Sequence, residues 1–204
     1  MDSFKTSLKK ILEFTASDAE CATDELVKKY RNHQTLAAAE YEELSRIDAL
    51  GADGAMVIKL AYSLASRAKT DKFRFGSAHR EEEIIDYLRA LFYTLPNETV
   101  YALMLDDRGR VTNSVVVSEG TINSSTVLPR RVLELVVKCG ASSIILAHNH
   151  PLGYANPSLE DIETTFVLKN MLASTGRQLL AHYVVASDGM YYKIDPAAEK
   201  AEAE

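Results

Sequence analysis

The chain has 204 residues, of which 47% are hydrophobic and 25% charged, and this ordinary globular composition excludes a collagen-like or low-complexity polypeptide. Two cysteines cannot form a disulfide framework or a cysteine-rich zinc module, and no apolar run approaches the ~20 residues that span a membrane. The net charge of −6 argues against binding of nucleic acid through bulk positive charge. Because residues 1–20 lack a signal-peptide pattern, we expect a cytoplasmic protein with no membrane partner.

The region 1–76 is expected to be all helical. Apolar residues recur there at helical spacing, and Ser17 with Glu20 fits a capping box. A glycine-containing turn at 50–54 separates two of the helices, which is typical of a helix-hairpin-helix-like region. The expected helices are 3–14, one that begins at the Ser17–Glu20 pattern, 40–47 and 55–67, and the linker is 69–77.

The region 77–195 alternates strand-like and helix-like segments, and we expect it to form one α/β domain. The order β-β-α-β-α-β-β, after an opening helix, indicates a sheet with helices packed on it. In the helix that begins at Pro129, we expect Val132, Val136 and Val137 to be buried. Residues 196–204 are expected to be a frayed tail. The predicted helices are 81–95, 129–139 and 158–176, and the predicted strands are 98–106, 110–117, 142–147, 182–187 and 190–194.

Chemistry-bearing side chains gather directly after the strand 142–147. His148 and His150 are two residues apart in an extended segment, so both imidazoles point to the same side. A loop stiffened by prolines then leads to Asp161 in the first turn of the next helix. Two histidines and one carboxylate leave one tetrahedral position open, which is the ligand count of a catalytic zinc site. The pattern Ser158-x-x-Asp161 is equally typical of a plain helix N-cap, and the two interpretations are compatible.

Other enzyme classes fit less well. The letters His148-Asn149-His150 are adjacent, whereas HNH nucleases spread such residues over a ββα unit. A zinc deaminase would need His-x-Glu with Pro-Cys-x-x-Cys, and Cys139 stands alone. The nucleophile-elbow motif of serine hydrolases is also absent from the sequence.

The stretch His148-x-His150-Pro151 followed by Ser158-x-x-Asp161 resembles the signature of the JAMM (JAB/MPN) metalloprotease superfamily. The fuller stretch HNHPLGYANPSLEDI, with GTINSS at 120–125 and VLPRRVLELVV, resembles the RadC family of bacterial JAB-domain proteins. This resemblance covers residues 98–194 and extends loosely over the N-terminal helices. It implies the α/β fold of JAB/MPN (cytidine-deaminase-like) domains, a mixed sheet flanked by helices. It also implies a zinc-dependent metallopeptidase that cleaves amide or isopeptide bonds in a peptide or protein substrate.

The resemblance also assigns roles. It implies that His148, His150 and Asp161 bind Zn²⁺, and that Glu98 acts on the bound water as general base and then as acid. Glu119 is the alternative base, because it precedes the GTIN stretch. Ser158 resembles the serine of the family that donates a hydrogen bond to the oxyanion.

A second function stays open from the sequence. Residues Leu128, Arg131, Leu152 and Ala181 replace polar residues that RadC-like proteins usually carry near the motif. These changes favour a metal-binding domain with weak or no hydrolysis, in a repair-linked protein that associates with DNA through its N-terminal helices. Backbone N–H groups and Lys59 or Arg67 would then contact phosphates. Against this, residues 1–80 hold 13 basic and 12 acidic residues, and Asp53 lies in the turn that would approach the DNA.

Overall fold

The computed structural model describes residues 2–30, 32–120, 129–151 and 153–198. The chain divides into two compact units. One comprises the residues up to Lys72 together with Tyr93–Pro96, and the other comprises Phe73–Phe92 together with the chain from Asn97 onward. Within the described residues, no helix combines the length and the apolar composition needed to cross a membrane.

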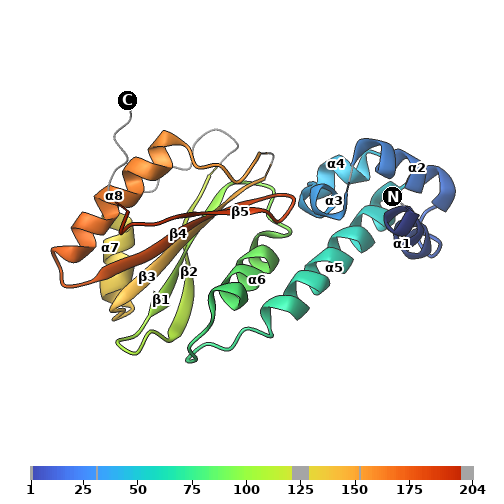
Figure 1. The fold of residues 1–204 in the computed structure, drawn as a ribbon. Coiled ribbons are helices and arrows are strands. Elements are labelled where there is room, and N and C mark those ends of the chain that lie inside the picture. Colours follow the sequence, from blue (N-terminus) through green and yellow to red (C-terminus); the bar gives the residue numbers. More distant parts are fainter. Residues whose placement is uncertain (1, 31, 121–128, 152, 199–204) are drawn as a thin grey trace. The chain divides into compact units, whose positions relative to one another are not determined.

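The N-terminal unit is built from helices around an apolar core. Leucines dominate this core, and several of them are fully buried because each helix turns one apolar face inward. The helices are α1 (Asp2–Leu12), α2 (Ala19–Lys29), α3 (His33–Ala38), α4 (Tyr41–Ser45) and α5 (Gly51–Thr70) (Figure 1). The fully buried core leucines include Leu8, Leu12, Leu26, Leu36 and Leu44.

Three details of this unit differ from the sequence prediction. The cap of α2 is Asp18 and not Ser17, because the Asp18 carboxylate accepts hydrogen bonds from the backbone of the first turn. The short helix α3 was not predicted, since six residues hold too little periodicity to stand out. Helix α5 already begins at Gly51, which adopts a φ of +66°, so Asp53 lies in the first helical turn rather than in a turn between helices.

The second unit carries a five-stranded mixed sheet with strand order β2-β1-β3-β4-β5. The pairs β1–β2, β1–β3 and β4–β5 are antiparallel, and β3–β4 is parallel, as the helical crossover between those two strands requires. The predicted element order is confirmed. The elements are α6 (Glu81–Phe92), β1 (Thr99–Leu105), β2 (Val111–Glu119), α7 (Pro129–Lys138), β3 (Ser143–His150), α8 (Leu159–Ala173), β4 (Gln178–Ala186) and β5 (Tyr191–Ile194).

Helices cover both faces of this sheet (Figure 1). α7 and α8 pack on one face, where Val132, Leu146 and Leu168 belong to one apolar cluster. α6 packs on the opposite face, where its Phe92 ring meets the ring of Tyr101 on β1. The result is a three-layer α/β/α arrangement, as expected of a JAB/MPN fold.

The buried face of α7 differs from the predicted one by a single residue. Val132, Leu135 and Val136 are buried, and Val137 is 53% exposed. Positions i, i+3 and i+4 share one face of a helix, whereas position i+5 lies on the flank. Strand β3 also runs farther than predicted and includes both His148 and His150.

Candidate metal centre

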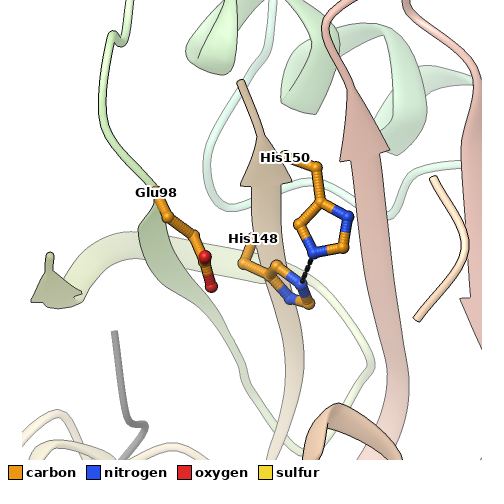
Figure 2. Close-up of side chains that lie close together, drawn as sticks. All are labelled: Glu98, His148 and His150. Atoms are coloured by element: carbon orange, nitrogen blue, oxygen red, sulfur yellow. Dashed lines mark hydrogen bonds between the residues drawn. The ribbon is translucent and has the colours of Figure 1, made fainter. Parts of the chain in front are cut away.

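Two histidines project from the last residues of β3 onto the sheet face that α7 and α8 cover. Alternation along the strand puts His148 and His150 on the same face as Leu146, which belongs to the apolar core. His148 is only 1% exposed, and His150 is partly buried. Their Nε2 atoms lie 3.1 Å apart, so the two imidazoles converge on one point (Figure 2).

Glu98 reaches the same point from the neighbouring strand. Val100 on β1 is paired with His148, so these two side chains lie on the same face of the sheet. Glu98 precedes Val100 by two residues, so its side chain also points to the face of His148. One ligand atom each from Glu98, His148 and His150 lies within 4.8 Å of the others, and these three residues form a group that could hold a metal ion. Figure 2 shows the Glu98 carboxylate directed toward His148.

Asn149 fixes the segment that carries Glu98. Its side chain points to the opposite face from the two histidines, because it lies between them in the strand. The Asn149 amide oxygen accepts a hydrogen bond from the Thr99 backbone at 2.8 Å, and its amide nitrogen donates to the Asn97 carbonyl at 3.1 Å. A single buried side chain therefore clamps the backbone on both sides of Glu98.

Asp161 approaches the histidines from the start of α8. Its Oδ1 lies 3.4 Å from Nε2 of His148, and its Oδ2 lies 4.0 Å from Nε2 of His150. The predicted N-cap is confirmed: Ser158 and Asp161 form a reciprocal capping box. In it the Ser158 hydroxyl donates to Asp161 Oδ2 at 2.6 Å, which leaves Oδ1 facing His148.

Each histidine is held through its other ring nitrogen. Nδ1 of His150 lies 2.8 Å from the Tyr154 carbonyl oxygen, so this nitrogen must carry the proton, and Nε2 presents a lone pair. Nδ1 of His148 lies 2.8 Å from Nε2 of His182 on β4. The second nitrogen of His182 lies 2.6 Å from the hydroxyl of Thr165 on α8.

Burial keeps the imidazoles of His148 and His182 neutral. It lowers the pKa of His148 to about 4, although the nearby Asp161 carboxylate opposes the shift. Burial also holds the pKa of His182 well below its ordinary value, with His148 and His150 acting in the same direction. A neutral imidazole is the form that binds metals.

The donor set fits a divalent cation. Two imidazole nitrogens and the carboxylates of Asp161 and Glu98 converge, with no lysine or arginine in the interactions described for them. Two lone pairs that face each other at 3.1 Å repel unless a cation or a proton lies between them. Taken as three ligands, the two imidazoles and the Asp161 carboxylate suit zinc and leave a fourth tetrahedral position, next to Glu98, for a substrate or for water.

The structure thus brings four of the predicted site residues together: His148, His150, Asp161 and Glu98. Ser158 lies at the cap, with its hydroxyl proton directed at Asp161. The alternative base Glu119 is exposed at the end of β2 and does not belong to the three-residue group that could hold a metal.

The structure describes two of the four positions that differ from the usual RadC pattern. Leu128 and Leu152 lie outside the described residues. Arg131 pairs with Glu134 on the exposed side of α7, and Ala181 is buried in β4.

Sequence reasoning missed three contributors: Asn149, Thr165 and His182. All three are buried polar residues. A histidine inside the run LLAHYVVA was the available signal for His182, because a buried imidazole needs hydrogen-bond partners.

Comparisons with known proteins identify the family of this chain. A family model described as a RadC-like JAB domain matches residues 78–198. A UPF0758 protein of Geobacter sulfurreducens is 33% identical over 168 residues, which cover 81% of this chain and 73% of that protein. A UPF0758 protein of Trichlorobacter lovleyi is 35% identical over 82% of this chain and 74% of its own length. A UPF0758 protein of Staphylococcus aureus is 30% identical over 81% of this chain and 77% of its own length. The chain therefore belongs to the RadC family of JAB-domain proteins.

Proposed function

We propose that this protein is a zinc-dependent hydrolase of amide or isopeptide bonds, with a peptide or protein as its substrate. The observation that carries the proposal is the convergence of two imidazole Nε2 atoms and two carboxylates at the end of β3. His148, His150 and Asp161 would hold the metal. A bound zinc ion would supply Lewis acidity, which lowers the pKa of water and polarises a carbonyl group.

Glu98 is the proposed general base. Its carboxylate lies beside the proposed ligands, within reach of a water molecule held at this point. It would take a proton from the attacking water and return it to the leaving amine. Asn149 supports this role, because it clamps the backbone on both sides of Glu98.

Ser158 has two candidate roles in this proposal. As a cap, it orders the first turn of α8 and directs Asp161. As an oxyanion donor, its hydroxyl would have to turn from Asp161 Oδ2 toward the substrate. The cap role needs no rearrangement, and we propose it as the main one.

The DNA-associated alternative draws less support from the N-terminal unit. Lys59, which would contact phosphate, is half-buried and donates to the carbonyl oxygens of Ala37 and Ala39 at 3.1 and 2.7 Å. Arg67 pairs with Asp71 at 2.8 Å. Retardation of duplex DNA by the full chain at low salt, lost as salt rises, would support the alternative.

Metal content tests the ligands. We expect about one zinc per chain in the protein, and almost none in the variant with both His148→Ala and His150→Ala. The matched control is His79→Ala, a histidine on the loop before α6 that bonds to the Arg74 carbonyl. Full zinc content in the double variant, measured by elemental analysis, would refute the site.

A second pair of variants separates the base from the ligands. We expect Glu98→Gln to keep zinc and to lose hydrolysis of a synthetic peptide library followed by mass spectrometry. Glu119→Gln, an exposed glutamate of the same unit, should keep both. Loss of zinc in Glu98→Gln would make Glu98 a ligand, and loss of hydrolysis in Glu119→Gln alone would transfer the base role to Glu119.

A further inference from the structure

We infer that Thr165 and His182 are positioning residues that fix the protonation pattern of His148 and keep its Nε2 free for a metal. This inference rests on the proposed metal site. Three segments supply the groups: β3 carries His148, β4 carries His182 and α8 carries Thr165. His182 and Thr165 are 1% and 0% exposed, so each must satisfy its polar atoms within the protein.

The hydrogen bond from Thr165 to the backbone of Asp161 has only one possible donor. The Thr165 hydroxyl lies 2.6 Å from the backbone carbonyl oxygen of Asp161, one turn earlier in α8. A carbonyl oxygen can only accept, so the single hydroxyl proton of Thr165 is donated there. The same hydroxyl oxygen lies 2.6 Å from Nδ1 of His182. With its proton already used, this oxygen accepts a hydrogen bond, and Nδ1 of His182 must carry the proton.

The donor and acceptor roles at His182 then determine those at His148, in the proposed metal site. A neutral His182 with its proton on Nδ1 has a lone pair on Nε2, which lies 2.8 Å from Nδ1 of His148. His148 therefore donates from Nδ1, and its own lone pair is on Nε2. That atom is the one that faces His150 and Asp161. The backbone carbonyl that sets the donor and acceptor roles in this series of hydrogen bonds belongs to Asp161. One proposed ligand therefore determines which ring nitrogen of another proposed ligand, His148, carries the proton.

The reverse set of hydrogen bonds would prevent His148 from binding a metal through Nε2. If the Thr165 hydroxyl donated to His182, then His182 would donate from Nε2, and His148 would carry its proton on Nε2. The metal would then meet an N–H instead of a lone pair. Two oxygens 2.6 Å apart at Thr165 and Asp161, with no proton between them, disfavour this arrangement.

Nitrogen-15 NMR of the metal-free full chain near neutral pH tests the inference without any metal. Two-bond couplings from ring protons distinguish the two neutral forms of each histidine. We expect both His148 and His182 to carry the proton on Nδ1. A proton on Nε2 of His148 in the wild-type chain would overturn the inference.

Substitution at Thr165 tests its consequence for the metal. Thr165→Val keeps the shape of the side chain but removes the acceptor, so His182 is free to reverse and move the proton of His148 to Nε2. We expect zinc affinity, measured by competition with a chelator, to fall about 10–100-fold, in the range found for groups that orient metal ligands. Thr165→Ser should restore it, and Thr164→Val, at the adjacent threonine of α8, is the matched control.

The outcomes separate the two claims. If the wild-type chain binds no zinc but His148 and His182 show the expected forms, the proposed function fails and the proton arrangement stands. If the chain binds zinc, and Thr165→Val changes neither the zinc affinity nor the His148 form, the positioning role is wrong and the metal site stands. The second conclusion needs a folded Thr165→Val, checked by circular dichroism, and His182→Phe gives a second route if that variant does not fold.

Discussion

The two units of the chain differ in what they bury. In the N-terminal unit the described buried residues are apolar except for Thr23, whose hydroxyl bonds to its own helix at Ala19. Among its described residues, the sheet unit buries six polar ones, and five of these lie at or next to the candidate metal site: Thr99, His148, Asn149, Thr165 and His182. Burying polar groups costs free energy unless partners are supplied, so their concentration at one end of β3 indicates a constraint on that region other than stability.

The comparison assigns different roles to the two cores. The helical unit is held by nonspecific apolar burial, which tolerates rearrangement of similar volumes. The site in the sheet unit depends on individual hydrogen bonds, each with one donor and one acceptor. Substitutions in the helical unit should therefore change stability without changing metal binding. Substitutions at the site in the sheet unit should change both.

The largest expected effect on stability is in the helical core. Leu26 is fully buried, and Leu26→Ala should lower the free energy of unfolding by about 2–5 kcal/mol through lost apolar burial and a cavity. Zinc content of the folded fraction should stay unchanged. Urea denaturation measures the first quantity and elemental analysis the second. Leu64→Ala, at a residue 68% exposed on α5, is the control and should change neither, whereas loss of zinc in Leu26→Ala would remove the distinction between the units.

Asn149→Ala should affect stability and function together. It leaves the Thr99 backbone N–H without its partner in a buried position, at a cost of about 1–3 kcal/mol. Because Glu98 loses its clamp, we expect hydrolysis to fall much more than zinc affinity. Asn113→Ala on the exposed side of β2 provides the comparison. Equal losses of zinc affinity and hydrolysis would show that Asn149 supports the histidines rather than Glu98.

Ser158→Ala should have a smaller effect. The loss of the N-cap destabilises the chain by about 1 kcal/mol, and zinc affinity falls because Asp161 loses the hydroxyl that holds Oδ2. Ser158→Thr should retain most of both. Thermal unfolding and chelator competition give the two values. A loss of kcat with unchanged zinc affinity would instead favour the oxyanion role.

The smallest effect is expected at Glu81, which joins α6 to the sheet. It accepts a hydrogen bond from the Tyr183 hydroxyl at 2.9 Å and pairs with Lys193 at 3.1 Å, and these contacts lower the pKa of its carboxyl below the ordinary 4.5. Its stabilising effect is therefore full above pH about 4.5 and lost as the pH falls through the lowered pKa. Since the pair is partly exposed, Glu81→Gln should cost less than about 1 kcal/mol at pH 7 and less still in acid. A cost that grows toward low pH would contradict this sign.

The sequence was sufficient for the parts of the site that lie close together along the chain. Alternation in an extended segment placed His148 and His150 on one side, and the cap pattern placed Asp161 at the start of α8. Glu98 was assigned from a family resemblance, because no local pattern distinguishes it from a solvated residue at a strand start.

The remaining contributors depend on strand pairing, which local patterns do not specify. Asn149 meets the chain at Asn97 and Thr99 only because β1 and β3 are neighbours. His182 faces His148 because the β3–β4 register shifts between Ile144 and Ile145, so Leu179 and His182 both point to the α8 face despite their odd spacing. Strict alternation from Leu179 would have placed His182 on the other face.

X-ray absorption at the zinc edge of the zinc-loaded chain tests the central claim most directly. The account predicts two imidazole nitrogens at about 2.0–2.1 Å and oxygen ligands at similar distances, and it predicts almost no bound zinc to measure in the chain in which both His148 and His150 are alanine. A sulfur shell near 2.3 Å, or a wild-type spectrum without imidazole scattering, would contradict it.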